Sequence, residues 1–83
     1  MPRFFFDSRD GDEFILDDEG LELAGIEAAR DEATAALRDI AKDAIPHSER
    51  RELAIEVRDE AGRQIIRASL WFEVQVLAEP SLA

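Results

Sequence analysis

An amphipathic segment at residues 26–45 most constrains how this chain can fold. At about 100° per residue, its apolar residues recur on one stripe with helical spacing, namely Ile26, Ala29, Ala33, Leu37, Ile40 and Ala44. Charged residues occupy the opposite face, which is the pattern of a helix packed on a core. Gly25 is an acceptable N-cap. Pro46 disfavours helical geometry in Ile45, so we expect the helix to end there.

The residues before this helix predict a β-hairpin. Three consecutive phenylalanines favour a strand at residues 2–7. A loop at residues 9–11, which contains a glycine, then leads to a second strand. This loop sets Phe4 opposite Leu16 and Phe5 opposite Ile15.

The residues after the helix predict a second hairpin. Apolar and polar residues alternate over residues 51–58 and again in a last strand that continues to residue 76. A loop at residues 59–62, or a bulge nearby, lets the apolar faces of the two strands coincide.

The predicted fold class is α+β, in the order β-β-α-β-β. It is a four-stranded, mainly antiparallel sheet with one helix packed on one face. We place the strands in the spatial order second, first, fourth, third. The chain is expected to form a single small domain over residues 1–83, with a loose tail at residues 77–83. The predicted core centres on Leu37, Ile40, Phe6, Ile55, Leu70 and Phe72.

Composition narrows the possible partners and the compartment. The net charge is −10 and the basic residues are scattered, so we expect neither nucleic acid nor an anionic membrane surface as a partner. The apolar run at residues 4–6 is too short for a signal peptide, and no segment approaches transmembrane length. We therefore expect a cytoplasmic protein.

Candidate chemistry is sparse. The chain has no cysteine and a single histidine, His47, which argues against zinc and against nucleophilic triads. The acidic turns do not have EF-hand spacing, although they are rich in oxygen ligands: Asp7, Asp10, Asp12, Asp17, Asp18 and Glu19. We expect no metal, no cofactor and no catalytic residue. A small enzyme using carboxylates is the least favoured function.

The face of the sheet that the helix leaves open suggests how the protein works. Aromatic and arginine residues ringed by polar ones are common at protein interfaces. We expect a non-enzymatic interaction module that forms a homodimer through this face, with an interface made of Phe5, Ile15, Ile65, Arg67, Trp71 and Glu73. The alternative is an acidic, antitoxin-like or regulator-like partner of a basic protein.

Three segments carry a resemblance to a known family. They are M-P-R-F-F-F-D-x-R-D-G at the start, D-x-E-G-L-E-L before the helix and L-A-I-E-V-R-D-E-A-G in the third strand. Together they resemble a family of short bacterial proteins classified only as a domain of unknown function. The resemblance implies one compact bacterial domain and brings no site residues with it. A fainter similarity, around residues 27–33, is to antitoxin domains.

Overall fold

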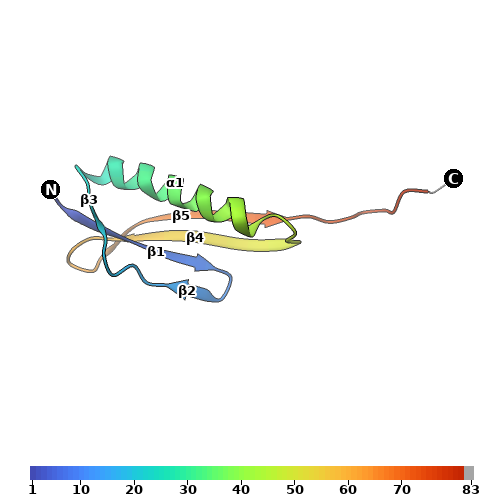
Figure 1. Cartoon of the computed structure of the whole chain (residues 1–83), viewed down its shortest axis with the longest axis horizontal. Coiled ribbons are helices and arrows are strands. Elements are labelled where there is room, and N and C mark those ends of the chain that lie inside the picture. Colours follow the sequence, from blue (N-terminus) through green and yellow to red (C-terminus); the bar gives the residue numbers. More distant parts are fainter. Residues whose placement is uncertain (82–83) are drawn as a thin grey trace.

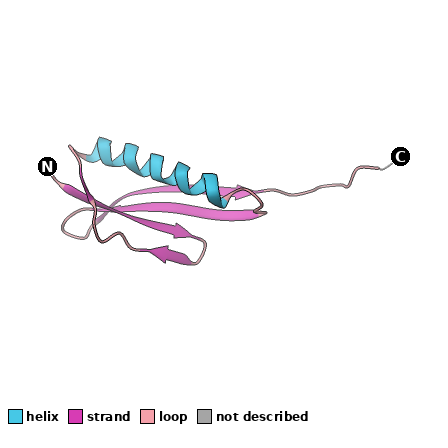
Figure 2. Cartoon of the chain, in the orientation of Figure 1, coloured by secondary structure: helices cyan, strands magenta, loops and turns pink. Residues whose placement is uncertain are grey.

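The computed structural model describes residues 1–81 and confirms the α+β fold, with strands on both sides of one helix. The elements are β1 (Arg3–Asp10), β2 (Glu13–Ile15), β3 (Leu21–Glu22), α1 (Ile26–Ala44), β4 (Arg50–Arg58) and β5 (Gln64–Glu73). The strands form an antiparallel sheet in the order β2-β1-β4-β5, and β3 pairs with β1. The helix lies on one face and contacts β4 and β5 (Figure 1). Figure 2 shows the two layers and the extended segment that follows β5.

The predicted strand order is wrong, because β4 and not β5 lies beside β1. The β1–β4 pairing runs from Phe5 opposite Arg58 to Asp10 opposite Leu53. Burial explains this order, since every residue of β4 from position 53 to position 57 is buried. A strand buried on both faces belongs in the middle of a sheet. β5 has exposed residues on both faces and lies at the edge.

The first hairpin also has a different register. β1 continues to Asp10, so Ser8 lies opposite Ile15 and Arg9 opposite Phe14. The turn is at residues 11 and 12, and Gly11 has a φ of 60°, a value that glycine adopts without strain. The polar residues from Ser8 to Asp10 thus belong to the strand and not to the loop.

The second hairpin matches the prediction in its faces and differs in its register, because a loop at residues 59–62 would pair Ile55 with Ile66 and Leu53 with Ala68. Ile55 lies opposite Ala68, and a bulge near Val57 and Arg58 precedes the turn. The coinciding apolar faces are therefore confirmed, and the structure has the bulge that was the alternative to a regular loop at residues 59–62. β5 ends at Glu73, before the predicted end of the strand.

The core lies where the small residues of α1 meet β1 and β4. The buried cluster contains Phe4, Ala29, Ala33, Ile55 and Val57, and Phe6, Leu37 and Ile40 pack against it. Of the residues predicted at the centre of the core, Ile55 is buried, and Phe6, Leu37, Ile40 and Phe72 are half-buried. Leu70, and Ile26 of the predicted helix stripe, are exposed. Ile26 is 57% exposed because it is the first residue of the helix, and Leu70 is 37% exposed because an edge strand has a neighbour on one side only. The predicted helix end is confirmed, with Ile45 as the C-cap, and Gly25 is the N-cap. No helix in residues 1–81 is long and apolar enough to cross a membrane.

Candidate functional site

The face of the sheet turned away from α1, here called the outer face, carries ion pairs instead of an apolar patch. Asp7 is only 2% exposed, and its carboxylate accepts hydrogen bonds of 2.7 and 3.1 Å from the guanidinium of Arg58. Arg58 also donates to the backbone oxygen of Asp17, whose own N–H donates to Asp7. These contacts fix the segment after β2 against the sheet.

The carboxylates of this cluster are held in their ionised form. Burial would raise the pKa of Asp7, but hydrogen bonds from Arg58 and from the Asp17 N–H outweigh it, so the pKa lies below its usual range. Burial likewise opposes ionisation of Asp17, and hydrogen bonds from backbone N–H groups again lower its pKa. General acid–base catalysis needs a pKa near the working pH. The geometry therefore suits these two residues to a structural role.

Asp17 fills a gap in the edge of the sheet. Its carboxylate accepts the Phe6 N–H, which has no strand partner between β2 and β3, and also the N–H groups of Glu19 and Gly20. Gly20 has a φ of 71°, and a Cβ there would lie 2.8 Å from the backbone oxygen of Phe4. The turn thus needs both this carboxylate and this glycine, whereas the sequence alone indicated only a solvated turn.

A second cluster on the outer face centres on Glu56. This buried carboxylate accepts a 2.9 Å hydrogen bond from Arg9 and lies 3.5 Å from the guanidinium of Arg67. The side chain of Arg67 remains 61% exposed. Arg67 therefore reaches from the edge strand β5 towards Glu56 on β4.

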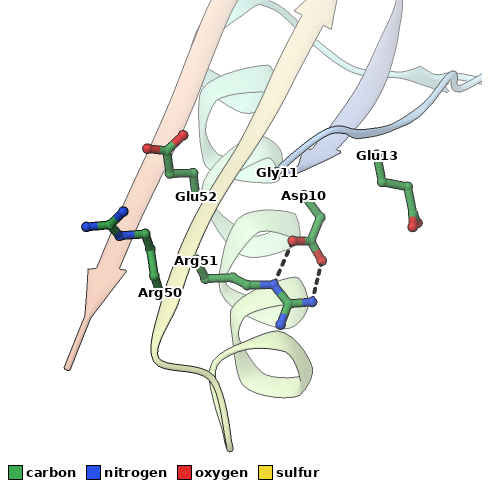
Figure 3. Close-up of a pocket in the computed structure, with 6 residues that line it drawn as sticks. All are labelled: Asp10, Gly11, Glu13, Arg50, Arg51 and Glu52. Carbon is green, nitrogen blue, oxygen red and sulfur yellow. Dashed lines mark hydrogen bonds and ion pairs between the residues drawn. The ribbon is translucent and has the colours of Figure 1, made fainter. Parts of the chain in front are cut away.

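A hollow of about 490 Å³ lies at the turn between β1 and β2, and Figure 3 shows the residues that line it. Its central feature is Arg51, which Asp10 holds with two hydrogen bonds of 2.7 and 2.9 Å. The hydrogen bond from Arg51 is the main reason that the pKa of Asp10 lies below its usual range. Arg51 also donates to the backbone oxygen of Ala44, in the last turn of α1, where a cation interacts favourably with the helix dipole. The charges of Asp10 and Arg51 are thus both used to hold the end of α1 against the β1–β2 hairpin.

Three residues of the predicted interface lie together. Arg67, Trp71 and Glu73 are all on β5, and alternation along the strand puts them on the outer face. Trp71 is 63% exposed. Glu73 forms a 2.8 Å ion pair with Arg50.

The other three predicted interface residues lie elsewhere. Phe5 is on the outer face of β1, under the guanidinium of Arg58, and β4 separates it from Trp71. The expected single patch of Phe5 and Trp71 therefore does not form. Ile15 lies opposite Ser8 on the helix side of the sheet, because of the changed register. Ile65 packs against the core.

The outward side of β5 is the feature that the sequence reasoning missed. The N–H of Val74 donates to the backbone oxygen of Glu49 in the chain preceding β4. Because backbone groups alternate in direction along a strand, the N–H and C=O groups of the odd-numbered positions face away from β4. These positions are Arg67, Ser69, Trp71 and Glu73. No other strand of the described chain pairs with this side.

The acidic side chains of residues 1–81 do not gather into a metal site. Within the described part of the chain, no three acidic or histidine side chains are grouped as a metal site would require. His47 is exposed in the turn after α1 and has a φ of 69°. Asp7 and Asp17, two of the acids in the predicted turns, are instead occupied by Arg58 and by backbone N–H groups.

Comparisons with known proteins give one match. The sequence model of a protein family described as a domain of unknown function, DUF6894, matches residues 3–71. No curated protein and no solved structure matches the chain.

Proposed function

The chain belongs to the DUF6894 family, a domain of unknown function, and we propose that this member is a non-enzymatic protein-interaction module that forms a homodimer. The contact is made by β5 and its outer-face residues. One observation carries the proposal: β5 is a strand of 10 residues, unpaired by any described strand on its outward side, with Trp71 63% exposed. A long unpaired edge strand is a template for pairing with another chain.

The charged residues support an interaction role over an enzymatic one. The buried carboxylates Asp7 and Glu56 are each bonded to arginine, and the pKa of Asp7 lies below its usual range because hydrogen bonds outweigh the effect of its burial. An enzyme that uses a carboxylate pair needs one of the two with a raised pKa. We place the homodimer in the cytoplasm, where a cysteine-free chain with a net charge of −10 stays soluble.

The test is the mass of the protein in solution, measured by light scattering over a range of concentrations. We expect twice the chain mass of 9.3 kDa. Trp71→Glu removes the largest exposed side chain of β5 and adds negative charge, so its mass should move towards that of one chain. Phe14→Glu makes the same change at an exposed aromatic residue of β2. Because β2 lies at the opposite edge of the sheet from β5, this variant should remain dimeric.

Two results would contradict the proposal. One is a wild-type protein that stays monomeric at high concentration. The other is a Trp71→Glu variant with the same dimer affinity as Phe14→Glu. Co-purification of an untagged basic protein with a monomeric chain would favour an acidic partner protein instead.

A further inference from the structure

We infer that the two copies join edge to edge, with β5 of one chain antiparallel to β5 of the other. The register sets Leu70 opposite the partner's Leu70, so that the two sheets become one continuous sheet. This inference rests on the proposed homodimer and specifies how it is built. It differs from the face-to-face contact expected from the sequence.

The two edges of the sheet are built differently. On the far edge, β2 has 3 residues and β3 has 2 residues, and the carboxylate of Asp17 takes up the Phe6 N–H in the gap between them. Short, interrupted edge strands do not pair readily with other chains. β5 has 10 residues, contains no proline, and its only register shift lies near its start. Among the described strands, β5 is therefore the one suited to pairing.

The backbone of β5 can complete its hydrogen bonds in this register. The residues whose N–H and C=O groups face outward are Arg67, Ser69, Trp71 and Glu73. With Leu70 at the two-fold axis, Arg67 lies opposite the partner's Glu73 and Ser69 opposite the partner's Trp71. Residues at such positions of an antiparallel ladder exchange two N–H···O bonds. Every outward position of one strand thus meets an outward position of the other.

Charge selects this register over its neighbours. Arg67 and Glu73 are the charged residues of β5. Within their own chain they contact Glu56 and Arg50, and in this register Arg67 of each chain also lies opposite the partner's Glu73. If Ser69 were at the axis, Glu73 would lie opposite Ile65. If Trp71 were at the axis, Glu73 would lie opposite Ser69. Opposite charges directly across a pair of strands are stabilising.

Apolar residues on the helix side fit the same register. Leu70 at 37% and Val74 at 52% are exposed. Leu70 meets the partner's Leu70, Phe72 meets the partner's Ala68, and Val74 meets the partner's Ile66. The N–H of Val74 already bonds to Glu49, so the strand can continue past Glu73 beside the partner's β5.

A single cysteine tests the register, because the chain has none of its own. Leu70 occupies a non-hydrogen-bonded position at the axis, where facing Cα atoms lie about 4.5 Å apart, within the range for a disulfide. Leu70→Cys should therefore form a covalent dimer under mild oxidation. Ala68→Cys is the control, since the sulfurs that it introduces into the two chains would lie about 13 Å apart along the strands and should not cross-link.

A mixing experiment tests the charge pairs. Arg67→Glu and Glu73→Arg each place like charges opposite one another in their own homodimers, which should weaken dimerisation at least about tenfold. Mixed in equal amounts, the two variants should form heterodimers, because both cross-strand contacts then join opposite charges. The readout is the solution mass of each variant alone and of the mixture.

The outcomes separate this inference from the homodimer itself. Suppose that the wild type is dimeric but Leu70→Cys does not cross-link, or the two charge variants form no heterodimer when mixed. Either result overturns the edge-to-edge register without contradicting the homodimer. A monomeric wild type overturns both. Cross-linking at position 70 but not at position 68, with heterodimers in the mixture, establishes the register.

Discussion

Replacing Asp17 by alanine should destabilise the protein far more than its place in an acidic turn suggests. The carboxylate accepts hydrogen bonds from the N–H groups of Phe6, Glu19 and Gly20 at 3.0 to 3.1 Å. The variant leaves the partly buried Phe6 N–H without an acceptor. It also loosens the turn, and with it the two backbone hydrogen bonds of residue 17: the one from Arg58 to its oxygen and the one from its N–H to Asp7.

The size of the effect follows from these contacts. A hydrogen bond to a charged group contributes about 1.5–3 kcal/mol, and an unsatisfied buried donor costs about 1–3 kcal/mol. The Glu19 N–H is exposed and the Gly20 N–H only partly buried, so both can bond to water instead and the loss should be about 2–3 kcal/mol. For a domain of this size, that lowers the melting temperature by roughly 10–20 °C.

The assay is thermal unfolding of Asp17→Ala beside Asp18→Ala. Asp18 is the exposed neighbour of Asp17, so the control removes the same charge from the same turn. Equal melting temperatures for the two variants would refute the role given to Asp17.

The pH dependence gives a second check. The pKa of Asp17 is lowered in the folded state, because hydrogen bonds from backbone N–H groups outweigh the opposing effect of burial. Its stabilisation is therefore complete above the ordinary pKa of about 3.9 and is lost as the pH falls through the lower folded value. The difference in stability between the wild type and Asp17→Ala should therefore disappear in strong acid. A gap that stays constant with pH would show that the charge is not involved.

Three further predictions concern the core, the buried ion pair and metals. Ile55→Ala, in the buried cluster, should lower the free energy of unfolding by about 2–5 kcal/mol, clearly more than Leu70→Ala at the exposed edge; denaturant titration compares them. Arg58→Met leaves the Asp7 charge buried without its partner and should cost about 3–5 kcal/mol at neutral pH, a loss that shrinks on acidification because burial then raises the pKa of Asp7. Its control, Arg63→Met, removes an exposed pair and should cost less than about 1 kcal/mol. Millimolar calcium or magnesium should leave the melting temperature unchanged apart from charge screening, and a calcium-specific rise with one ion bound per chain would contradict this.

Local patterns in the sequence were enough to predict α1, β1, β2, β4 and β5, whereas the two-residue strand β3, which pairs with β1, was missed. The helix was predicted with its end at Ile45 because helical spacing and Pro46 are signals within one segment. The strand order failed because several arrangements cover the same apolar faces. The unbroken burial of β4 from residue 53 to residue 57 distinguishes the observed order from the others. This burial includes Ala54 and Glu56, which the alternating pattern predicts to face solvent.

The candidate site was predictable only where its residues share a strand. Arg67, Trp71 and Glu73 lie together because alternation alone puts them on one face of β5. Phe5 and Ile15 depended on pairing between strands. The strand order puts β4 between Phe5 and Trp71, and the changed register of the first hairpin moves Ile15 to the helix side. Asp17 gave a weak signal, since an aspartate shortly before a glycine is typical of turns that bond their own backbone, but nothing in the sequence showed its contact with Phe6.

The position of β1 beside β4 has a consequence for how the protein is made. Phe5 lies opposite Arg58 in the sheet, so the whole helix must be synthesised before this pair can form, which takes roughly 3–10 seconds at usual rates of translation. During that time the three phenylalanines of β1 have only the short strands β2 and β3 as neighbours. Charged residues beside an apolar run hinder its association with other chains. Arg3 and Asp7 flank the phenylalanines on either side, so we expect Asp7 to hinder association of the nascent strand before Arg58 has been synthesised.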